Sequence, residues 1–218
     1  MQNNYDLIIF DWDGTLANST QLIVDAIRQG SADVGLPEPS QAAASGIIGL
    51  GFREAVYDLF GRIPDDLLAQ LTARYTHYYG LGEDSIPLFD GVAETIAHLK
   101  AKSVPLAVAT GKGRRGLNKA LANSGIGHHF IATRCVDECQ SKPHPQMILD
   151  LMDEVAASPE RTLMIGDTSF DLQMAQNAKV ASLAVTYGAH PVERLLAHAP
   201  LAHFDQFAHL SDWLKANV

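Results

Sequence analysis

Two pairs of aspartates follow short apolar runs, at points where a strand of a sheet would end. Asp11 and Asp13 follow the first run of the chain, and Asp167 and Asp171 follow a later one. In an open α/β sheet, ligands bind beyond the carboxyl ends of the strands. If the two runs form neighbouring strands, the four carboxylates share one pocket and repel one another unless a cation neutralises them. Oxygen ligands on rigid strand ends suit Mg²⁺, which usually serves a phosphate.

A hydroxyl group and an ammonium group stand in comparable places. Thr110 and Gly111 follow the apolar run 105–109, and a hydroxyl beside a glycine amide at a strand end is a donor pair for phosphate oxygens. Lys142 lies in a Ser-Lys-Pro-His-Pro segment, and lysine is a point charge that suits a phosphate or carboxylate oxygen. Taken singly, these residues also fit a helix cap and a solvated loop charge, and the acidic pairs fit a turn and a cap.

The elements that must position these residues follow an α/β pattern. Short apolar runs end in polar or glycine-containing loops, and helical apolar stripes lie between the later runs. Strands that alternate with helices form a parallel sheet covered on both faces. The pattern therefore predicts an open, doubly wound, Rossmann-like α/β domain. Its predicted strands are 7–10, 105–109, 130–132, 162–165 and 183–185.

A second unit is predicted between the first two strands, which lie much farther apart than one crossover helix requires. The intervening segment carries only helical stripes. An all-helical insertion at this point predicts a small cap, residues 17–84, packed over the edge of a core formed by residues 1–16 and 85–218. Backbone freedom for a hinge would come from glycines near both joints, Gly14, Gly80 and Gly82.

The composition excludes several classes of protein. The chain has 218 residues, of which 47% are hydrophobic and 19% charged, as in an ordinary globular protein. Its net charge of −9 argues against nucleic acid as a partner. No apolar stretch has the length of a signal peptide or a spanning helix, so we expect a cytoplasmic protein without a membrane partner. Cys135 and Cys139 lack Cys-x-x-Cys spacing, which favours ordinary reduced thiols.

The ordered motifs, taken together, resemble those of the haloacid dehalogenase-like superfamily, in its branch with a helical cap inserted after the first strand. The resemblance covers residues 5–188, and it is closest to phosphoglycolate phosphatase-like hydrolases. A combination of four ordered motifs is highly specific. They are Asp-x-Asp-Gly-Thr-Leu at 11–16, Thr110, Lys142, and Gly-Asp-x-x-x-Asp at 166–171.

The resemblance implies a phosphatase that hydrolyses a small organic phosphate, such as phosphoglycolate or a sugar phosphate. Asp11 would be the nucleophile that forms an aspartyl-phosphate intermediate. Asp13 would protonate the leaving oxygen and then activate water. Thr110 and Lys142 would hold the transferred phosphoryl group. Dehalogenases of this fold lack the second aspartate, so Asp13 favours phosphoester chemistry.

The resemblance also implies Mg²⁺ as the cofactor. Its ligands would be Asp11, the main-chain carbonyl of Asp13, and Asp167, with Asp171 at or just beyond the direct ligands. A small phosphorylated metabolite would be the partner of the enzyme. A monomer, or at most a weak dimer, is the default for a capped enzyme of this size.

Three basic residues are candidates for substrate recognition. Basic residues at the predicted helix start after Gly111 oppose the helix macrodipole, which suggests an anion nearby. We therefore expect Lys112 or Arg115 to contact a charged group of the substrate beyond its phosphate. The glycine-rich segment 46–53 resembles the specificity loop of relatives, and its Arg53 would either bind a second anionic group or be an exposed loop charge.

Three other functions compete with this interpretation. Residues 111–116 match the G-x-G-x-x-G dinucleotide pattern with Asp137 downstream, but this pattern follows a later strand and gives the acidic pairs no role. A phosphosugar mutase of the same fold would use a histidine and a lysine of the cap, which has only His77 and no lysine. A non-catalytic module on this fold is disfavoured because all the motif residues are intact.

Overall fold

Six parallel strands form the sheet that carries the predicted site residues. The computed structural model describes residues 4–218, and the strand order in its sheet is β3-β2-β1-β4-β5-β6. The order changes direction at β1, so the carboxyl ends of β1, β2 and β4 lie next to one another. The strands are β1 (Leu7–Phe10), β2 (Leu106–Thr110), β3 (Ala132–Cys135), β4 (Thr162–Gly166), β5 (Ala181–Val185) and β6 (Ala202–Phe204).

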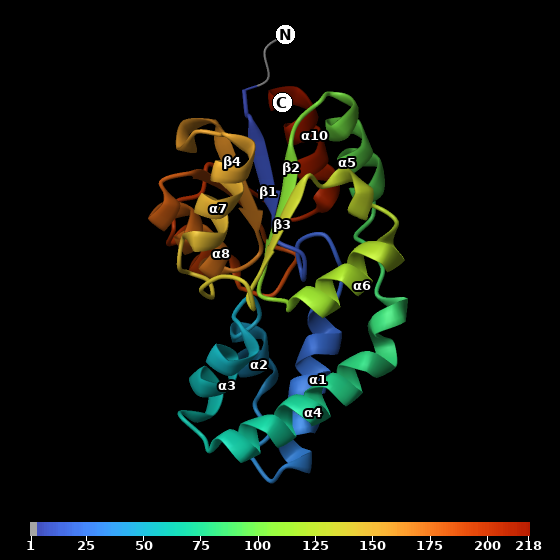
Figure 1. Ribbon diagram of the computed structural model, residues 1–218, viewed down its shortest axis with the longest axis vertical. Coiled ribbons are helices and arrows are strands. Elements are labelled where there is room, and N and C mark those ends of the chain that lie inside the picture. The colour runs from blue at the N-terminus through green and yellow to red at the C-terminus, as the bar shows by residue number, and fades with distance from the viewer. Residues whose placement is uncertain (1–3) are drawn as a thin grey trace.

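The central strand β1 is buried on both faces, as its continuous apolar sequence requires. Ile8 and Phe10 pack into one apolar cluster, and Leu7 and Ile9 pack into the other. Helices cover both faces of the sheet (Figure 1), which confirms the doubly wound α/β fold. The first cluster contains α5 (Val92–Ala101), α6 (Arg114–Ser124) and α10 (Phe207–Asn217), and the second contains α7 (Gln146–Val155) and α8 (Ser169–Ala178).

Four helices between β1 and α5 lie together beyond the carboxyl ends of the strands (Figure 1), and we call them the cap. The cap has its own apolar cluster, which includes Ile27 and Leu71 at the contact between its two long helices. Within the described residues, no helix has both the length and the apolar character needed to cross a membrane. The cap helices are α1 (Thr20–Asp33), α2 (Gln41–Gly46), α3 (Phe52–Phe60) and α4 (Asp65–Gly82).

The two connections between core and cap run side by side. Ala17 pairs with Leu88 in an isolated antiparallel bridge, and the amide of Asn18 donates to the carbonyl of Pro87 at 2.9 Å. Gly80 and Gly82 lie inside α4 and not in a loop, so the backbone freedom expected of them is not used at this joint. The remaining short elements are η1 (Glu83–Ser85), η2 (Gly127–His129), η3 (Pro159–Arg161) and α9 (Val192–Leu196).

Two features of the sheet differ from the sequence prediction. The third strand begins at Ala132 and not at Phe130, because the short helix η2 runs up to His129. The last predicted strand ends at residue 185, so the prediction missed β6. This strand has only three residues, and its central histidine is exposed at the edge of the sheet, so it leaves no apolar run to detect.

Candidate active site

Three of the predicted acidic side chains meet at the ends of β1 and β4. The amide of Asp11 donates to the carbonyl of Ile165 at 2.9 Å, so the two strands hold the first aspartate in register with the end of β4. One carboxylate oxygen from each of Asp11, Asp167 and Asp171 lies within 4.8 Å of the others, and all three residues are buried. Among residues 4–218, these form the one group of three or more such ligands.

The electrostatics of this cluster fit a cation. Burial raises the pKa of Asp11 well above its usual value; Lys142 opposes the rise, and the neighbouring carboxylates add to it. Burial and then Asp171 raise the pKa of Asp167 to about 7. The Oδ2 atom of Asp11 is buried and has no hydrogen-bond partner among the described residues. Because buried polar atoms normally have partners, this oxygen is suited to a metal ion.

Lys142 lies between two of the carboxylates. Its Nζ atom is 2.7 Å from Oδ1 of Asp11 and 2.6 Å from Oδ1 of Asp171, and its side chain is fully buried. Burial lowers the pKa of this lysine, but the two carboxylates outweigh the effect and the pKa lies above its usual value. The ammonium group therefore stays charged and fixes one oxygen of Asp11 while the other remains without a partner.

Hydrogen bonds orient both Asp167 and Asp171. Thr168 and Asp171 form a capping box at the start of α8, so the cap interpretation of Asp171 is correct and its place in the acidic cluster is an addition to it. Asp167 accepts hydrogen bonds from the Thr15 hydroxyl and the Ala189 amide, each at 2.8 Å. These contacts orient the two carboxylates before any ligand binds.

The Asp13 carboxylate is not part of this cluster, which holds three of the four predicted carboxylates, although Asp13 and Asp11 line the same cavity. It accepts a hydrogen bond from the Ser19 hydroxyl at 2.7 Å and lies 3.1 Å from Nζ of Lys112. Ser19 directly precedes the first cap helix, so a residue at the start of the cap orients Asp13. The separation leaves this side chain available for proton transfer.

Thr110 and Gly111 lie at the end of β2, as predicted. The Thr110 hydroxyl accepts a hydrogen bond from the Lys112 amide at 3.1 Å. A Cβ atom at Gly111 would lie 2.5 Å from the carbonyl oxygen of Gly49 and 2.7 Å from that of Leu50. Only glycine therefore allows the loop between α2 and α3 to lie this close to the core.

That loop, residues 47–51, contacts the core at two further points. The Gly51 amide donates to the Ser141 hydroxyl at 2.9 Å. Gly49 has a positive φ of +100°, and a Cβ atom there would lie 2.9 Å from Oγ1 of Thr168. The glycine-rich segment therefore lies close to the site.

His190 supports the same region from the core. The residue is only 2% exposed. Its Nδ1 accepts from the Ser169 amide at 3.0 Å, so Nε2 carries the proton and donates to the Gly46 carbonyl at 3.1 Å. Burial, with a contribution from Arg194, lowers the pKa of His190 to about 4. No spacing in the sequence indicates this contact.

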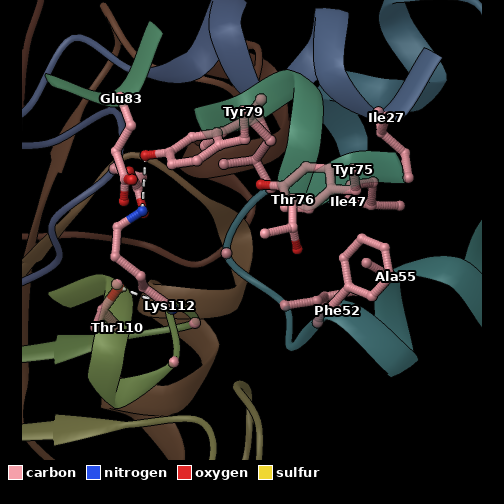
Figure 2. A pocket seen from close by; sticks show the side chains of 18 of the residues that line it. Ile27, Ile47, Phe52, Ala55, Tyr75, Thr76, Tyr79, Glu83, Thr110 and Lys112 are labelled. Atoms are coloured by element: carbon pink, nitrogen blue, oxygen red, sulfur yellow. Dashed lines mark hydrogen bonds and ion pairs between the residues drawn. The ribbon is translucent and has the colours of Figure 1, made fainter. Parts of the chain in front are cut away.

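A cavity of about 390 Å³ lies between the core and the cap, and Figure 2 shows the side chains that line it. Lys112 lies at its core side, where its Nζ atom is 2.9 Å from the Tyr79 hydroxyl. Arg115 also lines the cavity, whereas Lys142 does not. The core contributes Asp11, Asp13, Thr110, Gly111, Lys112, Gly113, Arg115, Gly116 and Lys119.

Arg53 does not line the cavity, although it is in the cap beside residues that do. Its guanidinium group lies 3.3 Å from the Asp65 carboxylate and 3.2 Å from the Tyr57 hydroxyl, and its side chain is exposed. The alternative of an exposed charge therefore describes its place in the structure, and we do not include it in the proposed site.

The contacts also bear on the competing functions. Asp137 accepts a hydrogen bond from the Arg114 amide at 3.0 Å, so it caps α6 and its carboxylate is not free for a ribose. Gly111, the first glycine of the G-x-G-x-x-G pattern, lies against the cap loop. His77 is exposed and does not line the cavity, so the cap residue considered for a mutase is not at the site.

Several known proteins are similar to this chain in sequence and in fold. The family model described as haloacid dehalogenase-like hydrolase matches residues 8–185. The "Probable phosphatase IndB" of Dickeya dadantii is 33% identical over 93% of this chain and 90% of its own length. The phosphoglycolate phosphatase of Haemophilus influenzae is 30% identical, with 96% of this chain and 98% of the relative covered.

A solved structure is also similar to this chain. The crystal structure of "a predicted phosphoglycolate phosphatase" from Haemophilus somnus superimposes with a TM-score of 0.84 and 28% identity, covering 100% of both chains. The chain therefore belongs to the haloacid dehalogenase-like hydrolase family. It is an enzyme of the phosphatase class within that family.

Proposed function

We propose that this enzyme is a Mg²⁺-dependent phosphomonoester hydrolase that acts through an aspartyl-phosphate on Asp11. The observation that carries the proposal is the state of this carboxylate. Asp11 lines the cavity, Lys142 holds one of its oxygens at 2.7 Å, and the other oxygen has no hydrogen-bond partner among the described residues. A nucleophile needs a fixed orientation, and the buried oxygen without a partner shows that this carboxylate is open to a ligand, either the metal ion or the phosphoryl group.

The residues that would hold Mg²⁺ are Asp11, Asp167 and the main-chain carbonyl of Asp13, with Asp171 at or just beyond them. Three buried carboxylates within 4.8 Å, and a single lysine among them, support a divalent ion bound by oxygen ligands. When bound, the ion neutralises these carboxylates and the charge of the substrate phosphate.

The first chemical step is an in-line displacement at phosphorus. A bond forms between a carboxylate oxygen of Asp11 and phosphorus, and the bond from phosphorus to the alcohol oxygen of the substrate breaks. Asp13 gives its proton to that oxygen, so that an alcohol leaves and not an alkoxide. Ser19 orients Asp13 through its 2.7 Å hydrogen bond.

Hydrolysis of the intermediate restores the enzyme. Asp13, now ionised, takes a proton from water, and the water oxygen attacks phosphorus while the bond to Asp11 breaks. Thr110 and Lys142 donate to the phosphoryl oxygens and stabilise their charge during both steps. The products are inorganic phosphate and the alcohol.

The substrate is proposed to be a small organic phosphate, and phosphoglycolate and sugar phosphates are the first candidates. Two relatives carry the name phosphoglycolate phosphatase, which supports testing that compound. The absence of lysine from residues 17–84 supports hydrolysis over a mutase reaction. A cytoplasmic location and a monomeric or weakly dimeric state stay predictions from the sequence.

The test is a phosphate-release assay over a panel of metabolite phosphates. Wild-type turnover should require Mg²⁺, stop with EDTA and return when Mg²⁺ is restored. Asp11→Asn should lower kcat by about 10³-fold or more. Asp58→Asn, on an exposed cap residue outside the cavity, serves as a matched control and should retain full activity. Wild-type rates in Asp11→Asn would contradict the assignment of the nucleophile.

A further inference from the structure

The cap side of the cavity is apolar. Its lining includes Ile27 from α1, Ile47 directly after α2, and Phe52 and Ala55 from α3. Figure 2 shows these side chains grouped at the end of the cavity away from Lys112, together with Tyr75 from α4. These residues come from four separate parts of the cap sequence, so the apolar surface arises only when the cap folds.

Three aromatic rings continue this surface toward the core. The ring centroids of Phe52 and Tyr75 are 4.8 Å apart, and those of Tyr75 and Tyr79 are 5.8 Å apart with 19° between the planes. Nζ of Lys112 lies 4.7 Å from the centroid of the Tyr79 ring. A substrate whose phosphate lies at Asp11 would therefore extend its alcohol part along aromatic faces.

The cap offers no cation to a second anionic group of the substrate. Of the described residues that line the cavity, all the basic ones come from α6 or the loop before it. Two of the three already have carboxylate partners, since Lys112 pairs with Asp13 at 3.1 Å and Lys119 with Glu83 at 2.7 Å. The third, Arg115, is exposed. The cap arginines outside the cavity are Arg28, Arg53, Arg62 and Arg74.

These features determine which alcohol the site can accept. An ionised carboxylate placed against Phe52 and Ile47 would lose its water and meet no cation from the cap, which disfavours binding. An apolar group in the same place is favoured because its surface is removed from water. The volume of about 390 Å³ lies in the range that encloses a small ligand with such a group.

We infer that the preferred substrate is a phosphomonoester whose alcohol carries an aromatic or branched apolar group in contact with Ile47, Phe52 and Tyr75. The inference rests on the proposed function, because it names the substrate class of the same site. It departs from the name of the relatives, since the glycolate part of phosphoglycolate carries a carboxylate and no apolar group.

Three esters with the same CH₂–O–phosphate linkage test the inference. Benzyl phosphate carries a phenyl ring, ethyl phosphate a methyl group and phosphoglycolate a carboxylate on that carbon. With Mg²⁺ in excess, we expect kcat/KM for benzyl phosphate to exceed that for phosphoglycolate by about 10- to 100-fold, with ethyl phosphate between them. The assay measures released inorganic phosphate, so the readout is identical for all three compounds.

Phe52→Ala identifies the part of the cavity responsible. This variant should lower kcat/KM for benzyl phosphate by about tenfold and leave ethyl phosphate within about twofold, because the smaller alcohol does not reach the ring. Asp58→Ala, on the exposed face of the same helix, should leave all three values unchanged. Circular dichroism and Tm establish whether both variants are folded. The comparison of the three esters with the wild-type enzyme does not depend on these variants.

The outcomes separate this inference from the proposed function. Preference of the wild type for phosphoglycolate over benzyl phosphate would overturn the inference and leave the phosphatase mechanism intact. Equal loss for ethyl and benzyl phosphate in a folded Phe52→Ala protein would also overturn it, because the residue would then act on the reaction and not on the apolar group. Failure to hydrolyse any of the three esters, with turnover of another phosphate of the metabolite panel, would overturn the inference alone. Failure across the whole panel would overturn the proposed function itself.

Discussion

The core side of the cavity is built from strand ends, whereas the cap side is built from helix faces. Asp11 directly follows the buried strand β1, and Thr110 is the last residue of the buried strand β2. Pairing with neighbouring strands fixes the register of both strands. Phe52 and Tyr75 come from separate helices whose relative position depends on side-chain packing within the cap. Charge and hydrogen bonds therefore dominate one side, and apolar contact dominates the other.

This difference separates two tasks of the enzyme. Chemistry at phosphorus needs charged groups held to a fraction of an ångström, which a hydrogen-bonded sheet provides. Selection of the alcohol needs a surface of matching shape and polarity, and that surface can change with the helices that supply it. We expect substitutions on the core side to act on all substrates and those on the cap side to act on some.

The strongest test of the core side is Lys142→Met. The variant keeps much of the side-chain volume but removes the charge that separates Asp11 from Asp171. We expect kcat to fall by about 10³-fold for every substrate. Stability should also fall, by roughly 3–5 kcal/mol, because two carboxylates are left buried together. Denaturant unfolding and phosphate release measure the two effects. A loss confined to one substrate would contradict the division between core and cap.

Asp13→Asn sharpens the assignment of proton transfer within the core. Asparagine can still accept the hydrogen bond from Ser19 but cannot deliver a proton. We expect kcat for an alkyl phosphate to fall by about 10²-fold or more. The loss should be much smaller for p-nitrophenyl phosphate, whose leaving group needs no proton. Equal losses for both substrates would assign Asp13 a role other than that of the acid.

The core site could be predicted from the sequence because its residues follow strands. Three of the four motifs come directly after a continuous apolar run, and the parallel arrangement then brings Asp11, Asp167 and Thr110 to one edge. Sequence order alone could not place the carboxylate of Asp13 beside Ser19 and Lys112, because that depends on the local turn after β1.

The cap side could not be predicted in the same way. The sequence left two alternatives for Arg53, a substrate contact and an exposed charge, and its position on α3 places it beside Asp65 and outside the cavity lining. His190 shows no spacing pattern, although it donates to the cap at Gly46. Tertiary packing decides both cases. For Arg53, a helical stripe indicates which face is buried without indicating what lies opposite it, and His190 lies in a loop with no periodic pattern.

The pH dependence of stability tests the charge of the core side. The folded-state pKa of Asp167, raised by burial to about 7, lies above its ordinary value of 3.8. Between these values the folded protein retains a proton that the unfolded chain has released, so stability falls as pH rises from about 4 to 7. We expect Tm of the metal-free protein to fall across this range.

Two controls distinguish Asp167 from other titrating groups. Asp167→Asn should flatten the fall in Tm, because the amide does not titrate. Saturating Mg²⁺ should raise Tm of the wild type most near pH 7, where the carboxylates of the cluster are ionised and bind the ion best. The same dependence in Asp167→Asn and wild type would show that this carboxylate does not cause it.

Gly111→Ala tests the contact between core and cap directly. The new methyl group would overlap the carbonyl oxygens of Gly49 and Leu50, so the cap loop has to move away from the site. We expect kcat/KM to fall by about tenfold for all substrates, mainly through KM, since closure over the substrate is weakened. Gly80→Ala is the matched control, because nothing lies within 4 Å of its Cβ position. It should raise stability slightly and leave kinetics unchanged.

Ser141→Ala is the mildest test of the same contact. It removes the 2.9 Å hydrogen bond to the Gly51 amide without adding bulk to the interface. The lost bond contributes about 1 kcal/mol to closure, so we expect KM to rise roughly two- to fivefold with kcat nearly constant. Because Gly51 precedes Phe52, the rise should be larger for benzyl phosphate than for ethyl phosphate. An equal rise for both would mean that the cap loop closes the site without positioning its apolar surface.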